Sequence, residues 1–162
     1  GLEARLVLHD ASRDDLAGST LSLAALGEAV RALPARRVVL LIDASFAAPS
    51  PGSRTLAGTA AAPTQAELEA ALELGPGRPV LLAAQPGQAA RVLGGGQAGL
   101  FSQVLREGIL GRADSDGDGH ISLSELFSHV RQEVQGRAGF ERSVQEPLAI
   151  GLSEQSPIGW PR

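Results

Sequence analysis

A chain of 162 residues suits a single domain spanning residues 1–162, since a chain of this size buries roughly 70% of its unfolded surface. The formal net charge of −4 excludes the electrostatic footprint of a nucleic-acid-binding protein or of one held on an anionic membrane. No apolar run reaches the roughly 18 residues that span a bilayer and no signal peptide is visible, so we expect a cytoplasmic protein without a membrane partner.

Apolar runs and helical periodicity alternate along the first part of the chain. Residues 5–9 predict a short strand that leads into an acidic, polar turn at 10–19. Apolar residues then recur on one helical face over 21–33, and Pro34 ends the predicted helix. The run 37–42 is a continuous stretch of valine, leucine and isoleucine after an arginine, which is typical of a strand buried on both faces.

A flexible loop is predicted at 47–63, because this stretch is rich in proline, glycine, serine and alanine and shows neither helical nor strand periodicity. Its basic residue Arg54 is a candidate self-cleavage point, and a plain loop is the other interpretation. Thr64 and Glu67 form a predicted capping box for a helix that runs to about residue 74.

The remaining elements follow from the same patterns. They are a buried strand at 79–84, a glycine joint at 94–96, helices at 100–110 and 123–134, and a late edge strand at 146–151. Strands alternating with helices predict an α/β fold, namely a three-layer α/β/α sandwich with a mostly parallel sheet. In such sheets the chemistry lies at the carboxyl ends of the strands, which directs attention to His9, to 43–46 and to 85–87.

The segment 114–125 has the spacing of an EF-hand calcium loop. Acidic residues stand at positions 1, 3, 5 and 12, with Gly119 at position 6 for the sharp turn and an isoleucine at position 8. A solvated acidic turn before a helix is the alternative. Calcium is the expected cofactor, and its expected ligands are three carboxylates, a backbone carbonyl, a serine that holds a water and a closing glutamate: Asp114, Asp116, Asp118, His120, Ser122 and Glu125.

Several segments, taken in order, resemble the caspase-like peptidases (clan CD, caspases and metacaspases) of bacterial type. Residues 38–46, Val-Val-Leu-Leu-Ile-Asp-Ala-Ser-Phe, are similar to an apolar strand followed by Asp-Ala-Cys. Residues 99–102, Gly-Leu-Phe-Ser, are similar to a Gly-Leu-Phe-Thr helix, and 113–119 to an acidic Ala-Asp-x-Asp-Gly-Asp-Gly segment. Gln145-Glu-Pro147 resembles a closing Gln-x-Pro, so the resemblance covers nearly the whole chain.

This resemblance implies a cysteine–histidine dyad that cleaves a peptide or protein substrate. In the metacaspase-like branch the aspartate of Asp-x-Cys lies at the base of the pocket for a basic residue, so Asp43 would favour Arg or Lys before the cut bond. The alternative for Asp43 is a strand-end carboxylate that satisfies nearby backbone N–H groups.

Two departures predict that the chain is inactive as written. Ser45 stands at the position of the nucleophilic cysteine, and a hydroxyl is far less acidic than a thiol. The family's histidine motif would precede the first strand, so the amino-terminal strands are expected to lie outside this chain. The other histidines do not replace it: we expect His9 to end a strand, the ring of His120 to point outward from the loop, and His129 to lie on the following helix.

Three explanations for Ser45 stay open: an introduced cysteine-to-serine change, a natural pseudoprotease that acts as a calcium-stabilised interaction module, or a fragment. In the last case another chain would supply the amino-terminal strands and the catalytic histidine. Calcium either switches activity or only holds its two flanking helices together. A different doubly wound domain, with Asp43 as a phosphoacceptor, is disfavoured because the chain contains no lysine.

Overall fold

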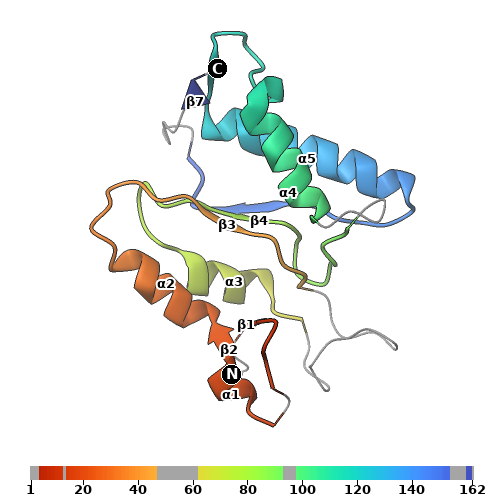
Figure 1. The fold of residues 1–162 in the computed structure, drawn as a ribbon. Coiled ribbons are helices and arrows are strands. Elements are labelled where there is room, and N and C mark those ends of the chain that lie inside the picture. Colours follow the sequence, from red (N-terminus) through yellow and green to blue (C-terminus); the bar gives the residue numbers. More distant parts are fainter. Residues whose placement is uncertain (1–3, 13, 47–61, 93–97, 154–159, 162) are drawn as a thin grey trace.

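The computed structural model describes residues 4–12, 14–46, 62–92, 98–153 and 160–161 (Figure 1). The predictions for Arg54, for the joint 94–96 and for nearly all of the loop 47–63 lie outside the described residues. The helices are α1 (Leu16–Ser19), α2 (Leu23–Arg31), α3 (Gln65–Leu72), α4 (Leu100–Glu107), the π-helical η1 (Gly108–Arg112) and α5 (Leu123–Phe140). The strands are β1 (Arg5–Val7), β2 (Thr20–Ser22), β3 (Leu40–Ile42), β4 (Val80–Leu82), β5 (His120–Ile121), β6 (Leu148–Ile150) and β7 (Trp160–Pro161).

A three-stranded sheet of order β3–β4–β6 lies at the centre of the described structure. β3 and β4 run parallel, with Leu40 opposite Val80, whereas β6 pairs antiparallel with β4. The pairs β1–β2 and β5–β7 are also antiparallel. The structure is therefore mixed α/β, as the predicted class requires. The described strands do not form a mostly parallel sheet, because the late edge strand runs against the other two.

Helices cover both faces of this sheet. In Figure 1, α2 and α3 lie on one face and α4 and α5 on the other. The side chains of β4 alternate accordingly: Leu81 packs in a core with residues of α4 and α5, while Val80 and Leu82 pack in a second core with residues of α2 and α3. All three are fully buried, which confirms the prediction of a strand buried on both faces for β4.

The same prediction is wrong for β3. Ile42 is buried against the α2–α3 face, but the side chain of Leu41, which alternates to the other face, is 41% exposed. The reason is that β3 is an edge strand: among the described residues no strand pairs with its outer side. An apolar residue on an open sheet edge is a site at which a further strand can pair.

The amino-terminal segment forms a separate ribbon and does not join the central sheet. β1 pairs with β2, so residues 20–22 are a strand where the start of a helix was predicted. The side-chain hydroxyl of Ser22 accepts the backbone N–H of Ala25, which fixes the start of α2 at Leu23. Arg5 donates from Nε to the hydroxyl of Thr20 at 2.6 Å and joins the two strands further. Within the predicted turn 10–19, Asp15 caps the short α1.

Local capping signals fix several of the remaining boundaries. The capping box of Thr64 and Glu67 is present, and α3 begins at Gln65 as predicted. α5 continues past the predicted end at residue 134 to Phe140, because Ala138 extends its buried stripe by one more turn. β6 lies within the predicted late edge strand. In the described part of the chain, no helix is long and apolar enough to cross a membrane.

Arg78, just ahead of β4, holds the carboxyl end of α2. Its guanidinium donates four hydrogen bonds of 2.6–2.9 Å to the backbone carbonyls of Val30, Arg31, Leu33 and Ala35. Val30 and Arg31 belong to the last turn of α2, whose C=O groups have few partners inside the helix, and Leu33 and Ala35 follow it directly. The contact therefore attaches α2 to the start of the central strand, and positive charge there also suits the helix dipole.

We expect Arg78→Ala to destabilise the fold by about 1–3 kcal/mol, because it removes four charged hydrogen bonds to backbone carbonyls, of which the one to Val30 is part-buried. Urea unfolding measures the change, with Arg36→Ala as the matched control, since the exposed Arg36 lies next to the same turn. If Arg78→Ala lowers the free energy of unfolding by less than about 0.5 kcal/mol, as for an ordinary surface residue, the contacts of Arg78 with the end of α2 do not stabilise the fold.

Candidate metal centre and strand-end pocket

The parallel pair β3–β4 carries a pocket at its carboxyl end. The chain leaves β3 at Ile42 and leaves β4 at Leu82, and because the strands are parallel the segments that follow lie at the same edge of the sheet. An open pocket of about 240 Å³ lies there. It brings together two predicted site residues with a segment that follows β4 and the start of α4; its lining residues are Asp43, Ala44, Ser45, Ala90, Arg91, Val92 and Gly99.

Asp43 caps the first turn of α4 from a different element. Its Oδ2 accepts the hydroxyl hydrogen of Ser102 at 2.5 Å and the backbone N–H of Ser102 at 3.3 Å. Gly99, the N-cap residue of α4, offers no side chain for this role. A Cβ added at Gly99 would lie 2.3 Å from Oδ2 of Asp43, so the glycine makes room for the carboxylate. The structure thus provides the strand-end role that was one of the two interpretations of Asp43, while the residue still lines the pocket.

Ser45 is exposed in the pocket, and its hydroxyl oxygen accepts the backbone N–H of Ala90 at 3.0 Å. The next residue, Phe46, is buried and bonds the turn after β4 twice, donating to the carbonyl of Gln88 and accepting the N–H of Gly87. These bonds hold the segment that carries Ser45 against the segment that follows β4. Serine chemistry at this position would also need a base.

Among the described residues that line the pocket there is no histidine. His9 follows β1 and is almost fully exposed beside Asp10, so it takes the ordinary role expected of a strand-end residue. His120 lies in β5 with an exposed ring, and His129 lies on α5 beside Gly108. None of the three lines the pocket that holds Ser45.

Two residues that build the pocket were not predicted as site residues from the sequence. Gln145 is 1% exposed; its Nε2 donates to the carbonyl of Ala83 and its Oε1 accepts the N–H of Arg91, both at 2.9 Å. It thereby positions the segment 88–91 over the end of β4, and its one sequence signal is the Gln-x-Pro pattern. The guanidinium of Arg91 has no partner among the described residues, and nothing in the local pattern marks it.

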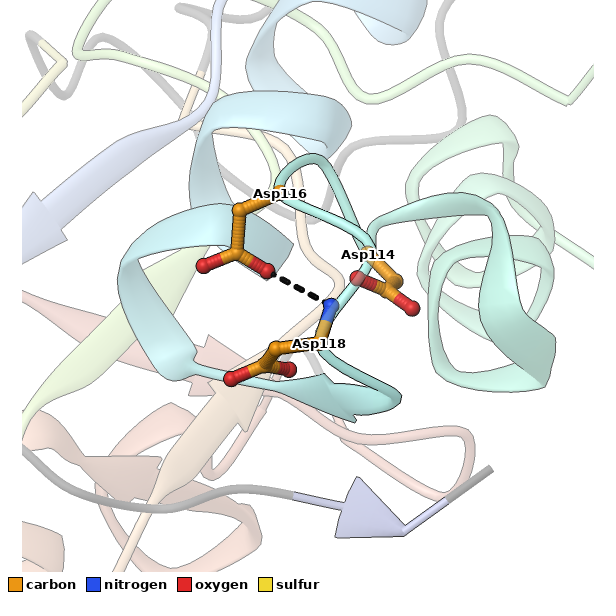
Figure 2. Close-up of side chains that lie close together, drawn as sticks. All are labelled: Asp114, Asp116 and Asp118. Carbon is orange, nitrogen blue, oxygen red and sulfur yellow. Dashed lines mark hydrogen bonds between the residues drawn. The ribbon is translucent and has the colours of Figure 1, made fainter.

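The predicted calcium loop folds so that three carboxylates converge. Oxygen atoms of Asp114, Asp116 and Asp118 all lie within 4.8 Å of one another. Figure 2 shows the three side chains turned toward the same space, with the bond from the N–H of Asp118 to Asp116. Gly119 has φ +86°, a conformation that side chains disfavour, so the predicted turn glycine is confirmed. The arrangement offers hard oxygen ligands to a divalent cation.

Two of the other predicted ligands serve the following helix, while His120 lies in β5. Glu125 and Ser122 form the capping box of α5, and Glu125 also accepts the hydroxyl and N–H of Ser115. These hydrogen bonds, first those from Ser122, lower the pKa of Glu125 to about 2. Glu125 is therefore a carboxylate, but it does not belong to the group of converging oxygens. Closing a shell around a cation requires its side chain to rotate away from Ser115.

A network of charged side chains joins the two helices that flank the loop. Arg137 of α5 donates to both carboxylate oxygens of Glu107 in α4, at 3.0 and 2.7 Å. Arg112 donates to the same Glu107, and Arg137 also reaches Glu133. This network lies at the opposite end of α4 from Asp43. It joins α5 to α4 through charged hydrogen bonds.

No protein-family model, no curated protein and no solved structure matches this chain. The resemblance to caspase-like peptidases therefore rests on the quoted residues alone.

The Glu107–Arg137 pair predicts a pH dependence. The hydrogen bond from Arg137 holds the pKa of Glu107 below its ordinary value of 4.5. Because the folded state then binds this proton less tightly than the unfolded state, the stabilisation is complete above pH 4.5 and is lost as the pH falls below it. We expect Glu107→Gln to lower the urea midpoint at neutral pH, and the difference from the wild type to shrink below pH 4.5.

The control is Glu141→Gln, since Glu141 is exposed at the end of α5 and should show no difference at any pH. A Glu107→Gln difference that stays constant down to pH 3 would argue that the network does not stabilise the charged carboxylate.

Proposed function

We propose that this chain is a caspase-like domain that recognises an extended peptide and, with serine at position 45, does not cut it. The observation that carries the proposal is the pocket at the ends of β3 and β4, which holds both Asp43 and Ser45. Helices on both faces of a sheet with a parallel pair support the three-layer sandwich that the resemblance implies. A peptide with one side chain in the pocket would lie across the open edge where these strands end.

The proposed loss of peptidase activity follows from the chemistry at Ser45. A hydroxyl needs a base within hydrogen-bond reach, whereas the one described contact of the Ser45 hydroxyl is the N–H of Ala90. In the family's mechanism a histidine supplies that base from the strands that precede this segment. The open edge of β3, with Leu41 exposed, is where such a strand would pair, whether it comes from the same protein or from another chain.

The pocket's charge bears on which peptide it takes. Asp43 favours a basic residue, and Oδ1 of its carboxylate accepts no hydrogen bond from a described residue. Arg91 lines the same pocket with a guanidinium that is unpaired in the described structure, and this favours an acidic residue as the second candidate. We place the basic residue first, because the resemblance assigns that role to Asp43.

We further propose that the loop 114–125 binds calcium. Three converging carboxylates and the twelve-residue spacing support an ion that prefers 6–8 oxygen ligands, with Glu125 completing the shell after it turns toward the ion. The Glu107–Arg137 pair already joins α4 to α5, which favours a structural role over a switch that opens the two helices. Calcium would then stabilise the fold by binding the folded state alone.

The peptide proposal predicts selective binding. An acetylated, amidated tetrapeptide of three alanines and a terminal arginine should bind more tightly than its aspartate counterpart. Asp43→Asn should weaken the arginine peptide roughly tenfold, because it removes the charge but keeps an acceptor for Ser102. Isothermal titration measures both affinities, and Asp10→Asn, at an exposed site outside the pocket lining, is the control.

If the aspartate peptide binds more tightly than the arginine peptide, and Arg91→Ala abolishes that binding, the pocket prefers an acidic residue and not a basic one. If the wild-type protein binds neither peptide, the proposal of peptide recognition is wrong. The inactivity is tested with Ser45→Cys in the full-length protein, with the upstream residues that would carry the histidine supplied, on fluorogenic arginine, lysine and aspartate peptides with and without calcium. Cleavage by Ser45→Cys but not by the wild type would identify a peptidase scaffold disabled at one atom, whereas no cleavage by either favours the natural pseudoprotease.

The calcium proposal has a built-in optical probe. Trp160 is the single tryptophan of the chain, and its backbone pairs with Ile121 at position 8 of the loop. We expect calcium to change the tryptophan emission and to raise the melting temperature. Asp116→Asn and Asp118→Asn should weaken calcium binding roughly tenfold or more, since each removes one ligand charge.

Asp14→Asn is the matched control, because Asp14 is an exposed acid outside the loop. If calcium at millimolar concentration changes neither the emission nor the melting temperature, the loop is an acidic turn that binds no calcium.

A further inference from the structure

We propose that Ser102 is a positioning residue, which with Gly99 holds the carboxylate of Asp43 so that one oxygen bonds α4 and the other faces the pocket ligand. This inference rests on the proposed peptide recognition and assigns a role to two residues of α4 and its cap. Neither residue was assigned a role in binding by the sequence. Ser102 itself does not touch the ligand; it acts through Asp43.

The two oxygens of Asp43 have different surroundings. Both hydrogen bonds from Ser102 end on Oδ2, one from the hydroxyl and one from the backbone N–H. Oδ1 accepts no bond from any residue that the structure describes, and Asp43 lines the pocket. Two donors on one oxygen fix the rotation of the carboxylate, which would otherwise turn freely on an exposed strand end. The fixed orientation presents Oδ1 as the acceptor for a ligand.

Gly99 makes this orientation possible. It lines the pocket as the N-cap of α4, and a Cβ there would lie 2.3 Å from Oδ2 and 2.9 Å from Oδ1. Such a distance cannot be kept, so any larger residue at position 99 would push the carboxylate away from Ser102. The glycine is thus needed for the close approach of Asp43 and not for a turn.

The charge of Arg91 makes the orientation matter more. Arg91 lines the same pocket, so a cationic side chain enters against its repulsion and gains only from a carboxylate oxygen held at the right place. A ligand group that meets a preoriented acceptor does not have to order it first, and this preserves affinity. Loss of the Ser102 hydroxyl should therefore affect binding even though Asp43 is still present.

A purely structural role of Ser102 predicts something different. If the contact only caps α4, its loss should lower stability and leave the affinity of the folded protein unchanged. Threonine keeps the hydroxyl and alanine does not, so this pair of substitutions separates positioning from general damage. Ser128, an exposed serine on α5 with no described hydrogen bond from its side chain, provides the matched control.

The experiment measures binding of the arginine tetrapeptide by isothermal titration to the wild type, Ser102→Ala, Ser102→Thr, Gly99→Ala and Ser128→Ala, each also tested for its melting temperature. We expect Ser102→Ala and Gly99→Ala each to weaken binding on the order of tenfold, because the carboxylate of Asp43 would no longer be held in the orientation that suits the ligand. Ser102→Thr and Ser128→Ala should stay within about twofold of the wild type.

The outcomes separate this inference from the proposed function. If the wild type binds the arginine peptide and Ser102→Ala binds it with the same affinity, the positioning role is overturned and peptide recognition is retained. Equal losses in Ser102→Ala and Ser102→Thr also overturn it, because the hydroxyl would then not be the group that matters. Failure of the wild type to bind the arginine peptide overturns both. Loss in Ser102→Ala with rescue in Ser102→Thr supports the inference, whatever happens to the melting temperature.

Discussion

The parallel pairing of β3 with β4 is the constraint on which the candidate site depends. It brings residues 43–46 and 83–91, which are far apart in the sequence, to one edge of the sheet. β4 can hold this place because its side chains are buried on both faces, in cores formed with α2 and α3 on one side and α4 and α5 on the other. Arg78 attaches α2 to the start of the strand, and Gln145 attaches the segment 88–91 to its end. The pocket is thus built on the most buried strand of the described structure.

α4 connects the two candidate sites. Its first turn is capped by Asp43 from the pocket, and its last turn continues through η1 into the loop that begins at Asp114. Near that end Glu107 binds Arg137 of α5, so both ends of the helix are held by charged groups from other elements. A cation in the loop and a ligand at Asp43 would therefore act on the same helix, which is the physical basis for any coupling between them.

The contacts around the loop support the structural role proposed for a cation. In a calcium switch the two flanking helices change their angle when the ion binds. Here the contact between Glu107 and Arg137, together with the close packing of Gly108 against Leu126 and His129, already fixes the helices. For the proposed ion, Glu125 would turn away from Ser115 and give up two hydrogen bonds, which is a local change.

Signals that act over a few residues could be predicted from the sequence. The capping box at Thr64, the turn at Gly119 and the convergence of Asp114, Asp116 and Asp118 all depend on spacing within one turn or loop, and the structure contains them. The tertiary structure decided what depends on which elements meet. It paired β1 with β2 outside the central sheet, left Leu41 exposed on an open edge and gave Asp43 the N-terminus of α4 as a partner. Each of these outcomes is set by contacts between residues distant in sequence, which no local pattern encodes.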